Sequence, residues 1–504
     1  MRALTALLLA CFAASTVAAE RAPDVVLRGE LTGKDNHTYR EVPFEVPAGT
    51  KRITIDVSYT GREQRTTIDL GLLGPGGFAE QDGFRGWSGG SKHRFTVSAT
   101  DATASFLPGE IWPGRWRLLL GIPNIRPTST ASFTADVWFS NDDEGFGPEH
   151  GLSAPLKTTA GWYRGDLHMH TAHSDGGCLN ASGTAKVPCP LFLTVVSAAK
   201  RGLDFIAISE HNTMSQVSEM RELQPYFDTM LMIPAREITT FEGHANLFGV
   251  SRPLDFRLGS PSVPDWNALT ADVAKAHGLI SINHPRRPND ETCMGCGFTP
   301  SKPVNMHGFQ AIEAINGRDP ERPETGIPFW EKQLNAGVRI TGIGGGDSHD
   351  GSDGARDEFA GVIGVPTTVV RADALSMDGI LDGIRAGHVF VDTEGTKDRM
   401  LEVTATAAGA GANAGAEAHM GDALRVAKGR QVHVAVTTAA VTGMRAIATL
   451  DGKRLSSTPI AADNTASLDW KSDGKSHWLR IDIRDATGKL ILLGNPIYLN
   501  QPSP

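Results

Sequence analysis

Histidine and carboxylate side chains gather at five places between residues 166 and 349, each directly after an apolar stretch typical of a strand. The five segments read DLHMHTAHSDG at 166–176, SEHN at 209–212, PAREITTFEGH at 234–244, NHP at 283–285 and GGGDSH at 344–349. Imidazole and carboxylate groups without thiolates suit Zn, Mn or Fe and argue against a purely structural zinc site. A single histidine at a strand end is usually a polar surface residue. So many positions that share this placement predict a metal site.

Two of these segments place a pair of candidate ligands two residues apart. His168 and His170 point to the same side of an extended strand, and so do Asp347 and His349. Each pair can therefore bind one centre.

A repeating order of helix, glycine and strand positions the five segments. Amphipathic helices are predicted over residues 191–200, 266–276 and 329–335, and each ends close to a glycine, the usual residue just past a helix end. Apolar strands follow at 203–209, 279–283 and 338–343. This alternation predicts parallel βα units, in a barrel or an open doubly wound sheet. In parallel barrels the carboxyl ends of the strands form the active-site face.

Short strands with alternating apolar residues flank this central zone. Examples are residues 52–57 and 116–120 before it, and 401–405, 432–436 and 478–483 after it. Alternation with frequent turn residues predicts an antiparallel β-sandwich on each side. We therefore expect a signal peptide at 1–19, an N-terminal β-sandwich at 20–157, a metal-binding α/β domain at 158–394 and a C-terminal β-sandwich at 395–504. A polar linker is expected at 140–148.

The first nineteen residues have the three parts of an export signal. Arg2 is followed by an apolar stretch over 3–14 and by small residues up to Ala19, as in a secretory signal peptide. Lipoprotein processing at Cys11 ranks second, because the apolar core before it would be very short. No other stretch is long and uncharged enough to span a membrane. We expect a periplasmic or secreted protein.

Cleavage after Ala19 leaves four cysteines in two local pairs, Cys178 with Cys189 and Cys293 with Cys296. In an oxidising compartment such pairs favour two loop-closing disulfides. The alternative for Cys293 and Cys296 is half a zinc site or a redox motif. The wider spacing of the other pair does not match the second half of a zinc site.

Composition bounds the class of protein. The 504 residues carry 48 Lys and Arg against 57 Asp and Glu, a formal net charge of −9, and 40% of them are hydrophobic. These values exclude a polytopic membrane protein and a mainly disordered chain. They give no electrostatic reason to expect a nucleic-acid partner.

The motif series as a whole resembles a known family. HMHTAHSDG, ISEHN, PAREITTFEGHANLFG, INHP and GGGDSH are similar, in this order, to the motifs of the PHP (polymerase and histidinol phosphatase) superfamily, over roughly residues 161–350. WYRGD at 162–166 and EITTFEGHANLFG at 237–249 look most like the secreted branch named after carbaryl hydrolase. The resemblance implies a distorted (β/α)7 TIM-like barrel that holds two to three divalent ions of Zn, Mn or Fe.

The resemblance also implies which residues bind these ions, and no ligand position is missing. It assigns His168, His170, Glu237 and Asp347 to a first metal, Glu237 with His244 and His284 to a second, and Asp175, His211 and His349 to a third. His173 is an additional histidine that we expect not to bind metal.

Two metals that lie close together lower the pKa of a bridging water and supply a hydroxide nucleophile. The leading hypothesis is therefore a phosphoesterase that acts on a small-molecule ester. Glu237, Asp347 and His349 are its expected catalytic residues, with Asp347, or water on the third metal, as the donor of a proton to the leaving oxygen. Guanidinium groups should bind the phosphoryl oxygens. Of the neighbours Arg286 and Arg287, we expect Arg286 to make this contact. Arg318 is a further candidate for binding the phosphoryl oxygens.

Two alternatives stay open at this point. The same site could hydrolyse a carboxylic or carbamate ester or an amide, since hydroxide attacks carbon as well as phosphorus. An exported glycan- or polymer-binding module is the other alternative, with Trp87, Trp112, Trp116 and Trp138 as its aromatic surface, although scattered Trp in strands is more often core. The sequence makes no prediction of oligomeric state.

Overall fold

The computed structural model describes residues 21–79, 83–141, 152, 154–291, 293, 295–351, 361–408 and 415–501. The predicted signal peptide, with Cys11, and most of the predicted linker lie outside these residues. The chain divides into two compact units, Met1–Phe95 with Ile111–Asn141, and Thr96–Glu110 with Asp142–Pro504. No helix in the described ranges is long and apolar enough to span a membrane.

The first unit consists of two four-stranded sheets. Their orders are β1-β8-β3-β6 and β2-β7-β4-β5. The strands are β1 (Val25–Thr32), β2 (Thr38–Val46), β3 (Arg52–Tyr59), β4 (Thr67–Leu73), β5 (Phe84–Trp87), β6 (Arg94–Ser98), β7 (Gly114–Asn124) and β8 (Thr130–Ser140). Alternate residues of β8 are buried, as the period of a strand requires. Two antiparallel sheets are what a β-sandwich needs, and the sandwich itself stays a prediction.

The four Trp of the first unit do not form one exposed surface. Trp116 is fully buried, whereas Trp112 is 53% exposed. Trp116 donates its indole N–H to the carbonyl of Trp112, and Trp87 packs against Tyr39. These contacts are those of core and edge residues, and they give no support to a glycan-binding surface.

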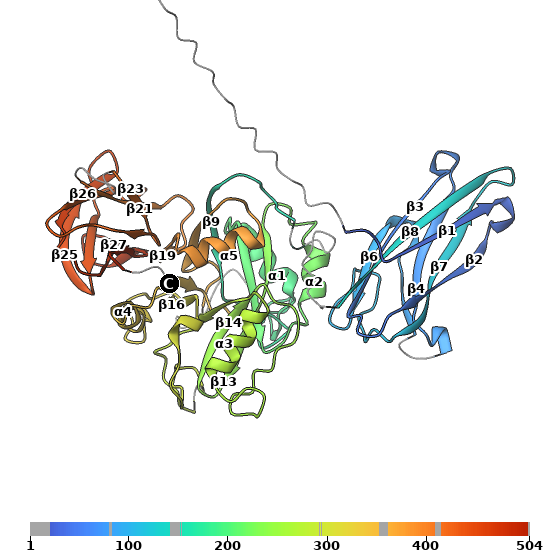
Figure 1. The fold of residues 1–504 in the computed structure, drawn as a ribbon, viewed down its shortest axis with the longest axis horizontal. Helices are drawn as coiled ribbons and strands as arrows, with labels where there is room; N and C mark the ends of the chain where they lie inside the picture. Colours follow the sequence, from blue (N-terminus) through green and yellow to red (C-terminus); the bar gives the residue numbers. More distant parts are fainter. Residues whose placement is uncertain are drawn as a thin grey trace, which may run out of the picture. The chain divides into compact units, whose positions relative to one another are not determined.

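The second unit is built around a fifteen-stranded sheet, several strands of which are labelled in Figure 1. Its main path runs β17-β16-β15-β14-β13-β12-β9-β18-β19-β28-β27-β24-β25. The strands up to β19 are β9 (Gly161–Asp166), β12 (Phe205–His211), β13 (Leu231–Thr240), β14 (Gly243–Phe248), β15 (Leu279–Ile282), β16 (Ala311–Asn316), β17 (Thr341–Gly345), β18 (Thr367–Ala372) and β19 (Val389–Asp392), beside the small hairpin β10 (Gly177–Leu179) and β11 (Lys186–Pro188).

Five helices connect these strands: α1 (Leu191–Lys200), α2 (Val217–Leu223), α3 (Trp266–Lys275), α4 (Ile327–Asn335) and α5 (Met377–Ala386). Three of them, α1, α3 and α4, fall where the helix and glycine pattern predicts helices. The residue after α5, Gly387, has a φ of 74°, a left-handed conformation that glycine adopts without steric cost.

The sheet is mixed, which differs from the expected all-parallel barrel. β12 is parallel to β9 and β13, and β16 is parallel to β15 and β17, but β14 is antiparallel to both of its neighbours. The chain reverses after β13 in a tight turn that ends at Gly243, whose φ is 143°. A closed barrel is not shown by the strand ladders. Past the strand ends, however, Asp347 and His170 donate backbone N–H groups to the carbonyls of His168 and Ser348, which joins the segments after β9 and β17.

The C-terminal strands that the structure describes are β20 (Met400–Ala407), β21 (Glu417–His419), β22 (Ala423–Leu424), β23 (Gln431–Ala439), β24 (Arg445–Leu450), β25 (Lys453–Pro459), β26 (Thr465–Lys471), β27 (His477–Arg484), β28 (Leu490–Gly494) and β29 (Ile497–Leu499). Six of them, β22, β24, β25, β27, β28 and β29, continue the same sheet. β28 pairs with β19, so the sheet crosses the predicted boundary at 394/395. A separate four-stranded sheet, β21-β20-β23-β26, shares a core with Val369 and Phe390.

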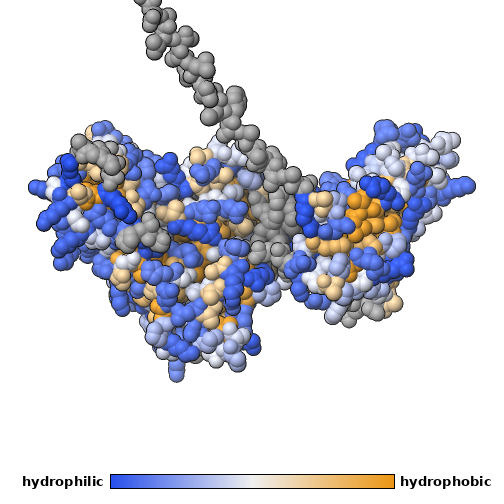
Figure 2. Space-filling view, in the orientation of Figure 1, coloured by the Kyte–Doolittle hydropathy of each residue, from blue (hydrophilic) through white to orange (hydrophobic). Residues whose placement is uncertain are grey.

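The outer surface is largely hydrophilic on the face seen in Figure 2, with apolar areas between the charged ones. The interior of the second unit is apolar, and it includes the fully buried Trp266, Trp330 and Trp478. Against this background, the buried polar residues at the carboxyl ends of β9, β13, β15 and β17 stand out.

Candidate metal centre

Four side chains from three strand ends form the centre of the site. His168 Nε2 lies 3.2 Å from His170 Nε2, 3.3 Å from Asp347 Oδ1 and 3.5 Å from Glu237 Oε2. His170 Nε2 lies 3.5 Å from the same Glu237 oxygen and 3.6 Å from the same Asp347 oxygen. All four residues are buried. The structure therefore brings together the residues expected at a first metal.

The separations within His168, His170 and Asp347 fit a shared metal ion, and His168, Glu237 and His284 form a second, overlapping group. Ligand atoms that lie roughly 2.0–2.2 Å from one ion in a tetrahedral arrangement are about 3.3–3.6 Å from one another. Imidazole and carboxylate ligands together suit Zn, Mn or Fe. One further imidazole atom, His244 Nε2, is buried and has no hydrogen-bond partner in the part of the chain that the structure describes. An uncompensated buried nitrogen of this kind favours a bound cation.

Glu237 joins the first group to the second. Its Oε2 lies 3.0 Å from His211 Nδ1, and its Oε1 lies 3.2 Å from both His244 Nδ1 and His284 Nε2. Asn283 donates its amide to the same Oε1 at 2.9 Å. Burial opposes ionisation, but the surrounding histidines, His168 above all, hold the pKa of Glu237 well below its usual value. Its charged carboxylate can therefore bridge two cations.

The residues expected at the second metal have a sulfur neighbour. His244, His284 and Cys296 place potential ligand atoms within 4.8 Å of one another. Cys296 is bonded to Cys293 in a disulfide, so it has no thiolate to offer. His284 donates its Nδ1–H to the carbonyl of Cys296, 3.0 Å away, which leaves Nε2 facing Glu237.

Asp175, His211 and His349 form the third group, and His170 joins them. Asp175 Oδ1 lies 3.3 Å from His349 Nε2 and 3.6 Å from His211 Nε2. Burial would lower the pKa of His349, but its hydrogen bond to Asp175 and the nearby Asp347 raise it to about 9. The His349 contact in turn overcomes burial and lowers the pKa of Asp175 to about 2. His173 is directed elsewhere, to Ser215 and Glu219.

The backbone is strained at three of these strand ends. Asn212, His284 and Asp347 have φ values of 52°, 25° and 51°, in the left-handed region that residues with a side chain seldom adopt. Each such residue costs on the order of 1–3 kcal/mol, and strain of this kind concentrates at functional sites. Two of the three are candidate ligands, so the fold holds them in place at the expense of local stability.

Glu313 on β16 is a buried carboxylate that the motif series does not include. Its Oε1 lies 2.6 Å from His168 Nδ1, while Oε2 accepts the backbone N–H of His284 at 3.0 Å and the amide of Asn316 at 2.9 Å. A carboxylate on Nδ1 fixes the ring so that Nε2 faces the metal group. The signal in the sequence is a single Glu within the apolar strand AIEAIN.

Removing this carboxylate is expected to weaken metal binding without removing a ligand. In Glu313→Gln the His168 ring loses its anionic partner, and affinity for Zn²⁺ or Mn²⁺ should fall about 10- to 100-fold. Isothermal titration of the metal-free protein measures this directly. Glu417→Gln, on the exposed start of β21, is the matched control. Equal affinities for Glu313→Gln and the control would contradict this role.

The arginine beside the cluster is Arg287, not Arg286. Arg287 Nη2 lies 3.0 Å from Asp347 Oδ2 and donates to Asn316 Oδ1 at 2.6 Å. Arg286 instead donates to the carbonyl of Thr325 and is exposed there. The two neighbours point in different directions, as adjacent side chains in a loop commonly do. Arg322 also reaches Asn316 Oδ1, at 3.0 Å. Arg318, the other arginine suggested by the sequence, is exposed.

The surroundings of Asp347 favour its ionised form. Burial would raise its pKa, but His168 and Arg287 lower it well below the usual value. Its position beside His168 and His170 favours the role of a ligand, and its expected role as a proton donor stays a prediction.

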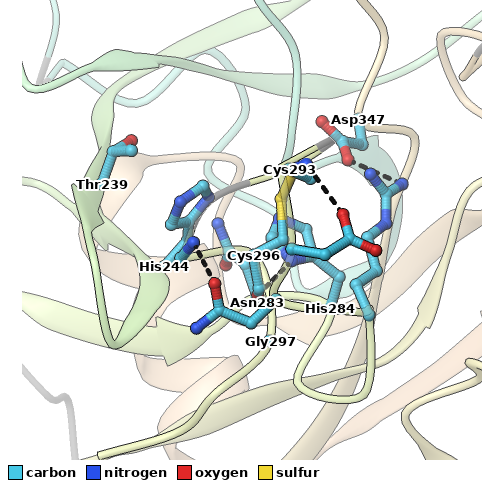
Figure 3. The surroundings of a disulfide bond; sticks show 12 residues. Thr239, His244, Asn283, His284, Cys293, Cys296, Gly297 and Asp347 are labelled. Atoms are coloured by element: carbon cyan, nitrogen blue, oxygen red, sulfur yellow. Dashed lines mark hydrogen bonds and ion pairs between the residues drawn. A yellow bond between two sulfur atoms is a disulfide. The ribbon is translucent and has the colours of Figure 1, made fainter.

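Both predicted disulfides are present. Cys178 is bonded to Cys189 and Cys293 to Cys296, with Cα–Cα distances of 4.9 and 5.5 Å. Figure 3 shows the second disulfide beside His284, His244 and Asp347. It closes the short loop 293–296, and the carbonyl of Cys296 in that loop accepts the hydrogen bond from His284.

Thiol labelling checks these bonds. Denatured protein that lacks residues 1–19 is expected to take up no iodoacetamide in the absence of reductant, whereas a chain that retains Cys11 should take up one. Mass spectrometry counts the labels. Reduction before labelling is the positive control and should give four labels. Four labels without reductant would contradict both disulfides.

The comparisons with known proteins add little to this geometry. No protein-family profile matches the chain, and no curated protein matches it. A solved structure from Bacteroides vulgatus, described as a two-domain protein containing a predicted PHP-like metal-dependent phosphoesterase, is similar to 67% of this chain and 96% of its own length. The identity is 16% and the TM-score 0.35, values too low to carry an argument. What the residues themselves show is a buried His, Asp and Glu cluster that could bind metal ions.

Proposed function

We propose that this protein is a metal-dependent hydrolase of ester bonds, with phosphoesters as the favoured substrates. The observation that carries the proposal is the buried pair His168 and His170, whose Nε2 atoms lie 3.2 Å from each other and 3.3–3.6 Å from carboxylate oxygens of Glu237 and Asp347. The resemblance of the motif series to the PHP superfamily supports it. We propose two to three divalent ions, because Glu237 connects the first group to His244 and His284, and a third group surrounds Asp175.

The chain's own residues have separable tasks in such a site. A divalent ion bound there lowers the pKa of water and polarises the ester. Glu237 holds the first two groups together, and Glu313 orients His168. Arg287, whose side chain is 28% exposed beside Asp347, presents guanidinium N–H groups that suit the non-bridging oxygens of a phosphoester. This arginine is the feature that favours phosphorus over carbon as the reacting centre.

A substrate panel tests the proposal. The purified protein is freed of metal with a chelator, reloaded with Mn²⁺ or Zn²⁺, and assayed on p-nitrophenyl phosphate, bis-p-nitrophenyl phosphate, naphthyl esters and naphthyl carbamates. We expect metal-dependent release of nitrophenol from at least one phosphoester. Turnover confined to the carbonyl esters would replace the phosphoesterase by a carboxylic or carbamate ester hydrolase, and no turnover with any metal would contradict both.

We further propose that the chain is exported after cleavage following Ala19. The positive, apolar and small-residue order of residues 1–19 and the two disulfides support export to an oxidising compartment. The N-terminal residue of protein recovered from the periplasm or medium is expected to be Glu20. A lipid-modified N-terminus at Cys11 would contradict this site of cleavage.

A further inference from the structure

An apolar cavity of about 260 Å³ opens at the tip of the hairpin between β13 and β14. Its lining includes Thr239, Phe241, Glu242, Phe256, Arg257 and Leu258. Phe241 is 86% exposed, and Phe256 and Leu258 are half-buried with one side packed on the core. Pockets for whole drug-sized ligands span about 300–1,000 Å³, so this cavity suits one part of a molecule.

The polar groups around the cavity are already engaged. Arg257 makes a bidentate pair with Asp255 through Nε and Nη2, both at 2.8 Å. Glu242 accepts the backbone N–H and the hydroxyl of Ser301, at 3.1 and 2.5 Å. A charged ligand would have to compete with these contacts. A ligand can therefore be recognised mainly by apolar surface, which is provided by the rings of Phe241 and Phe256 and the side chain of Leu258.

Thr239 lines the cavity and also contacts a residue of the metal centre. The Thr239 hydroxyl lies 2.6 Å from His211 Nδ1, and its backbone pairs with that of His244 across the hairpin. Thr239 also lies two residues after Glu237 on β13, so both side chains share one face of the strand. A molecule whose reactive group sits at Glu237 can thus place its next group beside Thr239 and Phe241.

We propose that this cavity, with Phe241 at its entrance, binds an uncharged apolar group of the ester substrate. The inference rests on the proposed function and narrows it, because it selects esters of apolar alcohols over small or highly charged ones. The cavity acts through binding alone and leaves the metal group unchanged. Phe241 is accordingly a specificity-determining residue.

A binding experiment tests the cavity independently of catalysis. Metal-free full-length protein is titrated with the neutral fluorescent probe N-phenylnaphthylamine and with its charged relative anilinonaphthalene sulfonate. We expect Phe241→Ser to lower the affinity for the neutral probe about tenfold, and Phe241→Leu to retain most of that affinity. Phe78→Ser is the matched control, since Phe78 is also exposed, at 68%, but lies in the other unit. Equal binding of the neutral probe to Phe241→Ser and wild type, or preference for the sulfonate, would overturn the proposal.

A chain-length series links the cavity to turnover. Ethyl, butyl and hexyl phosphates have similar leaving groups, and the matching alkyl acetates serve if only carbonyl esters react. In the wild type kcat/KM should rise by up to about fourfold per buried methylene, and Phe241→Ser should abolish that rise while the metal content stays unchanged. If the enzyme is active but its kcat/KM does not depend on chain length, the proposed role of the cavity is overturned and the proposed function is not. Absence of turnover with every ester would overturn the proposed function, and the probe titration would still decide on the cavity.

Discussion

Glu237→Gln is expected to reduce turnover by at least about a hundredfold and to lower the bound metal by at least one equivalent. The amide is neutral and presents an N–H donor where a carboxylate oxygen faces His211 or His284. Metal ions contribute several kcal/mol of transition-state stabilisation, and about 1.4 kcal/mol corresponds to a factor of ten. Loss of the bridging carboxylate should therefore have the largest effect of any single isosteric change in the site.

The measurement combines steady-state kinetics with elemental analysis of the same sample. Glu222→Gln provides the matched control, since Glu222 is an exposed carboxylate on α2 of the same unit. Its activity and metal content should equal those of the wild type. Wild-type turnover in Glu237→Gln would contradict a centre in which this carboxylate joins two metals.

Gly345→Ala is expected to destabilise the fold by about 1–3 kcal/mol and to abolish metal binding at the first group. A Cβ at residue 345 would lie 2.3 Å from Glu313 Oε1 and 2.7 Å from the Cβ of His168. Overpacking of a well-filled interior has this cost in general. Here it also pushes apart the buried carboxylate and the imidazole that it orients, so the effect on metal affinity should exceed the effect on stability.

Thermal unfolding with and without added Zn²⁺ separates the two effects. The variant should unfold at a lower temperature than the wild type. Added Zn²⁺ should raise the unfolding temperature of the wild type but hardly that of the variant. Gly161→Ala, at the start of β9, is the control, because its Cβ would meet nothing closer than Tyr163 at 3.9 Å. If Gly345→Ala gained as much stability from Zn²⁺ as the wild type, the close packing of Gly345 would not matter for the site.

Much of the candidate site could be predicted because its residues lie at strand ends in a regular order. His168 and His170 follow β9, Asp347 and His349 follow β17, and the glycine after each of α1, α3 and α4 indicates where the next strand begins. Local pattern is enough for such positions, since parallel strands bring their carboxyl ends to one edge. The antiparallel β14 could not be predicted in this way, because a two-residue turn after Thr240 reverses the chain and leaves His244 on a returning strand.

The partners of the ligands were harder to predict, since they depend on contacts between distant parts of the chain. Glu313 meets His168 across 145 residues of sequence. Arg287 and Arg286 are equivalent in the sequence, and only the loop conformation after His284 directs Arg287 to Asp347. The lowered pKa of Asp347 likewise arises from His168 and Arg287, which the fold brings beside it. Such features require the three-dimensional arrangement.

The metal content of the purified protein tests the central claim most directly. Apo protein is dialysed against Zn²⁺ or Mn²⁺, freed of unbound metal, and analysed by inductively coupled plasma mass spectrometry beside the double variant His168→Ala with His170→Ala. We expect two to three equivalents per wild-type chain and at least one fewer in the variant, with both proteins folded by circular dichroism. Less than one equivalent in the wild type, or the same content in both proteins, would contradict a metal centre at these strand ends.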